Sequence, residues 1–215
     1  MSSLRKLEVE EANMKVENGR LIIEIDSNLE KLLGIRKTEL SKVNVGDVIK
    51  SATDIEYIVL EHLENGTTRV IRKDIMTNQM KFDNTRNNFA ISSIRKYLND
   101  DYFKNEIIPG FGESNVVEHE VDLLSLDGFD DYGKCSVKVG LLTIDDYRKY
   151  HKNCLKENLD TYWWLSTPDS TPSGYGDCCV QYVNGNGGVG YGDCIWDGGV
   201  RPDLILKSNI FVSLA

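Results

Sequence analysis

Three turns rich in asparagine and glycine, each between two β-prone runs, most constrain what this chain can fold into. Asn-Gly pairs favour tight hairpin turns because both residues tolerate the positive φ that such turns require. The sequence therefore predicts three antiparallel hairpins, with turns at residues 18–19, 65–66 and 184–188 between strands at 14–17 and 20–25, 56–62 and 67–72, and 179–183 and 189–194. Strands and helices do not alternate in a βαβ pattern, and no glycine-rich phosphate loop leads into a helix. The predicted fold class is α+β.

Two helices are predicted between the second and third hairpins. A serine within residues 92–93 caps the first, and Pro109-Gly110 is expected to end it. Thr143 begins the second helix with Asp146 at the third helical position, which is the spacing of a capping box. Short strands are predicted at residues 139–142, 204–206 and 210–212, and the last two are expected to close the sheet near its start.

The chain is expected to divide into an N-terminal addition, residues 1–44, and a body, residues 45–215. In the addition, the first hairpin precedes a short helix that Ser27 and Glu30 cap and Gly34 ends. This ββα unit over residues 14–40 contains no pattern typical of catalysis or ligand chemistry. We therefore expect it to anchor the protein or to mediate homo-oligomerisation.

Charge and hydropathy exclude several classes of partner. The net charge is -9, whereas binding to a nucleic-acid backbone requires clustered lysine and arginine. No apolar run approaches the roughly 18 residues of a membrane span, so membrane insertion is not predicted. The N-terminus turns acidic before any apolar stretch, which differs from a secretory signal. These features predict a protein made in the cytoplasm.

The five cysteines do not match a metal site. Cys135 and Cys154 are isolated and Cys178 and Cys179 are direct neighbours, whereas zinc sites use spaced pairs of ligands. An odd number of cysteines in a chain without a secretion signal favours reduced thiols. Neither a metal nor a cofactor is predicted.

A glycine-flanked loop carries Asp127, Asp130 and Asp131. Such a cluster could supply oxygen ligands to calcium, or it could be a set of solvated loop carboxylates. The alternating aspartate spacing of an EF-hand loop is absent, which favours the second interpretation.

Residues 162–202 combine apolar anchors at both ends with a polar, turn-rich middle. We expect Trp163 and Trp164 to pack in the core, and Arg201 to be a buried structural partner in an ion pair rather than a ligand contact. The middle is rich in tyrosine, aspartate, asparagine and glycine, a composition typical of paratopes, in which rigid aromatics supply contact area and small polar residues adapt. The alternative is that the aromatics are ordinary sheet residues and the glycines loops. The predicted ligand-binding residues are Tyr175, Asp177, Cys178, Tyr182, Asn184, Asn186, Tyr191, Asp193, Trp196 and Asp197.

No catalytic residue is predicted. The histidines at 62, 119 and 151 are dispersed, and none is expected to lie as a base beside a serine or cysteine nucleophile. The sequence thus indicates a binding protein rather than an enzyme.

Five ordered segments over roughly residues 45–207 resemble the DUF6273 family of bacterial and phage proteins. They are Gly46-Asp47, residues 88–99 (NFAISSIRKYLN), residues 138–143 (KVGLLT), residues 163–168 (WWLSTP) and residues 199–202 (GVRP). The chain departs from the family at Leu165-Ser166-Thr167-Pro168, where the family pattern reads Leu-Arg-Ser-Pro. The resemblance implies a C-type-lectin-like fold, of the branch shared with formylglycine-generating enzymes and with the variable proteins of diversity-generating retroelements. In those variable proteins the terminal segment carries a diversified binding surface.

Residues 173–199 are rich in the residue types that such diversification produces. The leading hypothesis is a phage-encoded display protein, with or without assembly into a virion, whose partner is a host-surface protein or glycan. Two alternatives are an intracellular phage factor that binds a host defence protein, and an enzyme of the formylglycine-generating type. The enzyme would need an activated cysteine pair, for which Cys178, Cys179 and Cys194 are available.

Overall fold

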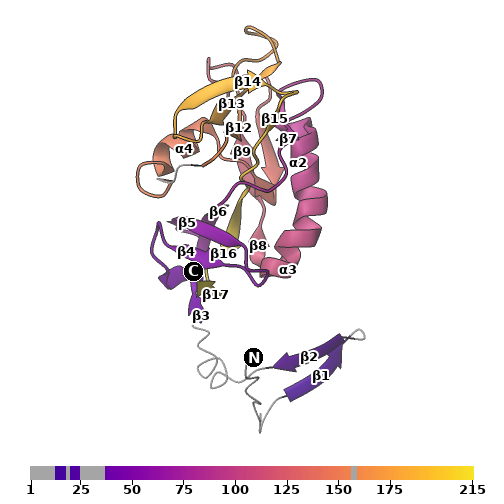
Figure 1. Cartoon of the computed structure of the whole chain (residues 1–215), viewed down its shortest axis with the longest axis vertical. Helices are drawn as coiled ribbons and strands as arrows, with labels where there is room; N and C mark the ends of the chain where they lie inside the picture. Colours follow the sequence, from indigo (N-terminus) through magenta and orange to yellow (C-terminus); the bar gives the residue numbers. More distant parts are fainter. Residues whose placement is uncertain (1–12, 18–19, 25–36, 156–158) are drawn as a thin grey trace, which may run out of the picture. The chain divides into compact units, whose positions relative to one another are not determined.

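A computed structural model describes residues 13–17, 20–24, 37–155 and 159–215 (Figure 1). The chain forms two compact units, Met1–Lys37 and Thr38–Ala215. The fold is mixed α and β, with mostly sheet and few helices, which confirms the predicted α+β class. No helix among the described residues is both long and apolar enough to span a membrane.

The first unit contains the first predicted hairpin. Strands β1 (Asn13–Glu17) and β2 (Arg20–Glu24) are antiparallel, with Met14 opposite Ile23. The turn residues 18–19 and the predicted helix from Ser27 lie outside the described residues.

The second unit is built on an eight-stranded sheet that curls into a half-barrel. The strand order is β11-β16-β6-β5-β4-β17-β3, and β8 also pairs with β16. The strands are β11 (Val139–Gly140), β16 (Asp203–Lys207), β6 (Thr67–Arg72), β5 (Glu56–Leu63), β4 (Val48–Lys50), β17 (Phe211–Leu214), β3 (Lys37–Glu39) and β8 (Val116–Val117). Because β17 pairs with β4, the last strand closes the sheet at its start, as predicted. A short 3-10 helix, η1 (Leu40–Lys42), follows β3.

The second hairpin, β5–β6, forms around the predicted Asn-Gly turn. The side chain of Asn65 accepts hydrogen bonds from the backbone amide and the hydroxyl of Thr67, at 3.2 and 2.6 Å. Gly66 has φ of +76°, a conformation that favours glycine. The local chemistry of the turn therefore sets the register of β5 against β6.

The first predicted helix is longer than expected and changes type along its length. After a 3-10 turn, η2 (Phe89–Ile91), it runs through α2 (Ser93–Tyr97), the π-helical segment η3 (Leu98–Ile107) and α3 (Ile108–Phe111). Ser92 caps its start by accepting a hydrogen bond from the amide of Arg95. The expectation that Pro109-Gly110 ends the helix is wrong. Pro109 lies in the first turn of α3, where a proline is tolerated, and the helix ends at Gly112, whose φ is +82°.

The second predicted helix, α4 (Ile144–Tyr150), begins as expected. The side chain of Thr143 accepts from the amide of Asp146, and the side chain of Asp146 accepts from the amide of Thr143, so the capping box is confirmed. The remaining elements are β7 (Met80–Lys81), η4 (Glu113–Asn115), β9 (His119–Asp122), β10 (Lys134–Val137), β12 (Trp163–Pro168), β13 (Cys179–Val183), β14 (Val189–Asp193) and β15 (Asp197–Gly198).

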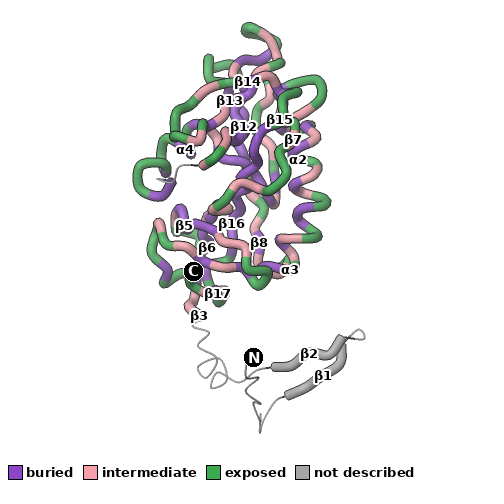
Figure 2. Tube along the Cα trace, viewed as in Figure 1, coloured by how far each residue is buried: buried purple, intermediate pink, exposed green. Residues whose placement is uncertain are grey.

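A three-stranded sheet, β12-β13-β14, lies at the end of this unit away from β3 and β17 (Figure 1). Every residue of β12 is buried, and Figure 2 shows the contrast between this strand and the exposed turn of the β13–β14 hairpin. Trp164 belongs to the larger hydrophobic cluster and Trp163 to a second cluster that includes the apolar residues of α4. The prediction that both tryptophans pack in the core is confirmed.

Arg201 is buried, as predicted, and it connects the two sheets. Its Nε and Nη2 donate to the backbone carbonyls of Arg72 and Lys73, at 2.8 and 2.6 Å. Its guanidinium carbon lies 5.3 Å from the centre of the Trp163 ring, within cation–π distance. The glycine-valine-arginine-proline motif thus holds β12 against the end of β6.

Candidate recognition surface

The predicted ligand-binding residues lie on or beside the hairpin formed by β13 and β14. In its register, Tyr182 is opposite Gly190 and Gln181 is opposite Tyr191. Because successive side chains of a strand point to opposite faces, Tyr182, Gly190 and Gly192 share one face of the sheet, and Gln181 and Tyr191 share the other.

Tyr182 is a packing residue rather than an outward-facing one. Its ring lies 4.6 Å from that of Tyr162 and 6.2 Å from that of Trp164, measured between centroids. A Cβ atom added at Gly190 would come within 2.8 Å of this ring, so the glycine leaves room for it. Tyr182, one of the predicted ligand-binding residues, therefore fills a half-buried site against the larger cluster.

The two other predicted aromatic anchors are exposed but lie on different faces. Trp196 is 54% exposed, and its indole ring lies beside Gly192, where an added Cβ would meet it at 3.0 Å. Tyr191 is 61% exposed and is on the opposite face, next to the buried Gln181. The two side chains therefore do not form one flat patch.

A hydrogen-bonded loop after β12 presents the most exposed aromatic side chain. The hydroxyl of Ser170 accepts from the amide of Tyr175 at 2.7 Å and donates to Asp127 at 2.6 Å. Gly174 packs so closely against Phe129 and Ser170 that a Cβ would not fit. Tyr175 itself is 96% exposed. A fixed loop base thus carries a tyrosine that almost nothing covers.

The loop that carries Asp127, Asp130 and Asp131 is hydrogen-bonded to this segment. Hydrogen bonds from Ser125 and Ser170 lower the pKa of Asp127 below its ordinary value. A hydrogen bond from the Ser173 amide, at 2.9 Å, lowers the pKa of Asp131. Among the residues that the structure describes, no group of three or more histidine, cysteine, aspartate or glutamate side chains is arranged to hold a metal ion. Two of the three aspartates singled out in the sequence therefore act as hydrogen-bond acceptors within the protein.

The loop and the end of β14 meet at one end of the hairpin. The amide of Cys194 donates to the carbonyl of Cys178 at 2.8 Å, and that of Trp196 donates to the carbonyl of Asp193 at 2.9 Å. Asp177 faces Arg86 at 3.8 Å. This end, which we call the loop end, consists of the predicted residues Tyr175, Asp177, Cys178, Asp193 and Trp196. Asp197 lies apart from it on β15, which pairs with β7, and its carbonyl accepts a hydrogen bond from the hydroxyl of Tyr162.

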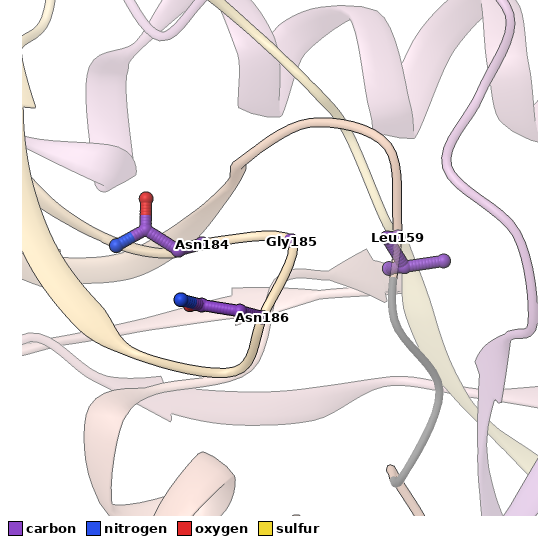
Figure 3. A pocket seen from close by; sticks show the side chains of 4 residues that line it. All are labelled: Leu159, Asn184, Gly185 and Asn186. Atoms are coloured by element: carbon purple, nitrogen blue, oxygen red, sulfur yellow. The ribbon is translucent and has the colours of Figure 1, made fainter.

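The opposite end, which we call the turn end, carries Asn184 and Asn186. Together with Gly185 and Leu159 these residues line an open pocket of about 540 Å³ (Figure 3). Figure 3 shows both asparagine side chains extending the same way from the turn, while the Leu159 side chain extends the other way from a neighbouring segment. The amide of Leu159 donates to the carbonyl of Gly185 at 2.9 Å.

Roughly 15 Å separates the two ends, since β13 and β14 are each five residues long. The structure thus brings five of the ten predicted residues together at the loop end, places two at the turn end and leaves Asp197 on β15. Tyr182 and Tyr191 lie between them on opposite faces. Leu159, Ser170 and Gly174 also help to build this surface, and they were not predicted from the sequence. The only sequence signal for them was the unusual glycine content of the segment.

Two thiols near the loop end, those of Cys179 and Cys194, have raised pKa values. The Sγ atoms of Cys178 and Cys179 are 3.3 Å apart. Burial, followed by the hydrogen bond with Cys178, raises the pKa of Cys179 to about 12. Burial and the charge of Asp193 raise the pKa of Cys194 to about 12. Both thiols stay protonated near neutral pH, whereas nucleophilic cysteines are thiolates.

No protein-family model matches this chain, and comparisons with curated proteins and with solved structures find no match.

Proposed function

We propose that this chain is a ligand-display protein with a C-type-lectin-like body, encoded by a phage, that binds a host-surface protein or glycan through the loop end of the β13–β14 hairpin. One observation carries the proposal. Residues 172–197 expose Tyr175 and Trp196 at the loop end, by 96% and 54%, and Tyr191 on the opposite face of the hairpin, by 61%, whereas Trp163 and Trp164 are fully buried. Exposed tyrosine and tryptophan side chains beside small polar residues are the composition of binding surfaces, and this supports the proposal.

The chemistry of the loop end suits such partners. Aromatic rings supply rigid contact area at low conformational-entropy cost, and they offer flat faces to a sugar ring or an apolar side chain. Asp177 and Asp193 are half-buried beside them, and carboxylates accept hydrogen bonds from hydroxyl or amide donors. The surface therefore combines stacking groups with directional acceptors.

The raised thiol pKa values support binding over catalysis. An enzyme of the formylglycine-generating type needs an activated cysteine, and Cys179 and Cys194 are held in the protonated form. An intracellular phage factor that binds a host defence protein could use the same surface. This alternative hypothesis differs from the display hypothesis only in the location of the partner.

The test compares two sets of exposed aromatic residues. A triple variant, Tyr175→Ala, Tyr191→Ala and Trp196→Ala, is assayed for binding to labelled bacterial cells and to an array of bacterial surface glycans. The matched control is Phe211→Ala, which removes an aromatic ring that is 67% exposed on β17.

We expect the triple variant to keep the wild-type circular dichroism and urea midpoint while losing about tenfold or more in binding, because binding energy concentrates in a few aromatic anchors. The control should bind as wild type does. Unfolding of the triple variant would show that these rings belong to the core. Equal loss in the control would show that the contacts are nonspecific, and absence of binding to every cell and glycan by the wild type would favour the intracellular reading.

A further inference from the structure

A second pocket, of about 190 Å³, lies between the end of β6, the segment after it and the long helix. Its lining includes Arg72 from β6, Asn78 and Met76 from the following segment, and Tyr97, Tyr102 and Glu106 from the helix. None of these residues belongs to the proposed recognition surface. The pocket therefore needs its own explanation.

The π-helical segment explains how the helix supplies three side chains to one pocket. The amide of Ile108 donates to the carbonyl of Phe103, five residues back, which is the π-helical pattern. In an α-helix, with about 3.6 residues per turn, Tyr97 and Tyr102 would be rotated roughly 140° apart and Tyr97 and Glu106 would lie on opposite sides. The wider turn brings all three toward the same side. π-Helical segments are rare and are frequently found at functional sites.

The backbone of Arg72 is held rigidly at the mouth of this pocket. Its amide donates to the carbonyl of Pro202 and its carbonyl accepts from Arg201, both at 2.8 Å. Arg72 is directly opposite Tyr57 in the pairing of β5 with β6. The guanidinium therefore projects from a fixed point on the sheet.

The charge of Arg72 lacks a carboxylate partner. Its Nη1 donates to the Tyr102 hydroxyl at 3.3 Å, and its buried Nε has no hydrogen-bond partner. Among the described residues, no carboxylate oxygen lies within 4 Å of this guanidinium. Arg69, on the same strand, provides the contrast, because Asp146 and Asp203 both pair with it at 2.7 Å. The unpartnered Nε of this half-buried guanidinium is a donor that an anionic group of a ligand would satisfy.

Glu106 has the opposite charge and lines the same pocket. Within the part of the chain that the structure describes, Glu106 has no ion-pair partner and accepts no side-chain hydrogen bond. A simple anion would gain from Arg72 but would be repelled by Glu106. A ligand that carries both charges would satisfy both side chains.

We propose that this pocket binds a free α-amino acid, with its carboxylate on Arg72 and its ammonium group on Glu106. Arginine presents a planar fork of donors that matches a carboxylate. The hydroxyls of Tyr97 and Tyr102 and the amide of Asn78 add hydrogen-bonding groups, and Met76 gives an apolar wall for a small side chain. The volume is that of a single residue-sized molecule. This site is independent of the recognition surface proposed above.

The test is isothermal titration of the full chain with each of the twenty amino acids, up to about 10 mM, which detects affinities as weak as the millimolar range. The amino acid that binds best is then compared with its deaminated acid and its decarboxylated amine. The variants are Arg72→Gln and Glu106→Gln, and the control is Arg148→Gln, an exposed arginine paired with Asp145 on α4.

Each charge-assisted hydrogen bond contributes about 1.5–3 kcal/mol, so we expect each pocket variant to bind about tenfold to a hundredfold more weakly. Arg148→Gln should bind as wild type does. Glu106→Gln should bind the deaminated acid more tightly than wild type does, because the repulsion is removed. The Glu106→Gln result tests the proposed amino-acid site even if Arg72→Gln does not fold. The proposal is refuted if no amino acid binds, or if either folded pocket variant retains wild-type affinity.

Discussion

Replacing the buried Trp163 by alanine should destabilise the fold, whereas replacing an exposed tryptophan should not. The Trp163 side chain is 1% exposed, packs edge-on against Tyr147 at 5.9 Å and lies under the guanidinium of Arg201. Replacing a buried tryptophan by alanine costs roughly 3–5 kcal/mol of unfolding free energy. Loss of the cation–π contact adds about 0.5–2 kcal/mol. We therefore expect Trp163→Ala to lose about 5 kcal/mol.

The measurement is urea unfolding followed by far-ultraviolet circular dichroism. With a urea dependence of about 2.5 kcal/mol per M, the midpoint should fall by about 2 M. The matched control is Trp196→Ala, which removes the same side chain from a site that is 54% exposed. Surface changes cost about 0.5 kcal/mol or less, so its midpoint should move by about 0.2 M. The reasoning is refuted if Trp163→Ala unfolds at the wild-type midpoint, or if the two variants lose equal stability.

Two further predictions concern the frame. Burial alone would raise the pKa of Asp146, but the paired charge of Arg69 lowers this pKa below its ordinary value. The ion pair therefore stabilises the fold fully above the unfolded-state pKa of about 4. This stabilisation is lost as the pH falls through the lower folded-state pKa. Asp146→Asn should thus cost about 2 kcal/mol at pH 7 and progressively less below about pH 4 in urea titrations, and a constant deficit down to pH 2 would contradict this. A Cβ at Gly198 would lie 2.5 Å from Nε1 of Trp164, so Gly198→Ala should lose roughly 1–3 kcal/mol. The control is Gly188→Ala, whose Cβ would meet only the flexible side chains of Asn186 and Asn184, at 3.3 and 3.6 Å, and which should lose less than about 1 kcal/mol. Equal urea midpoints for the two variants would exclude overpacking at Gly198.

Features that depend on neighbouring residues could be predicted from the sequence. The turn at Asn65-Gly66 and the capping box of Thr143 and Asp146 are hydrogen-bonded within three residues, so the local sequence is sufficient to determine them. The burial of the tryptophans also followed from their size and their apolar neighbours. These signals predicted the α+β class, the pairing of the three hairpins and the helix starts at Ser92 and Thr143.

Features that depend on packing could not be predicted. Pro109 is a helix breaker by local rules, but the change from π to α geometry places it in a first turn, where its missing amide is tolerated. The same change aligns Tyr97 with Glu106, which α-helical periodicity would place on opposite sides. Arg72 comes from a strand distant in the sequence, so nothing local indicated that it would share a pocket with them.

The register of the third hairpin limits which residues of the recognition surface can vary. Composition alone treated every tyrosine and asparagine between residues 173 and 197 as equivalent. The structure divides them, because Tyr182 fills the space left by Gly190, and Gly174 leaves no room for a side chain, so a change at any of these three positions disturbs the frame. Tyr175 and Trp196 project from backbone that other hydrogen bonds already hold, so their side chains can change without that cost. If the proposed recognition surface diversifies, we expect it to vary at the loop end and to retain Gly174 and Gly190.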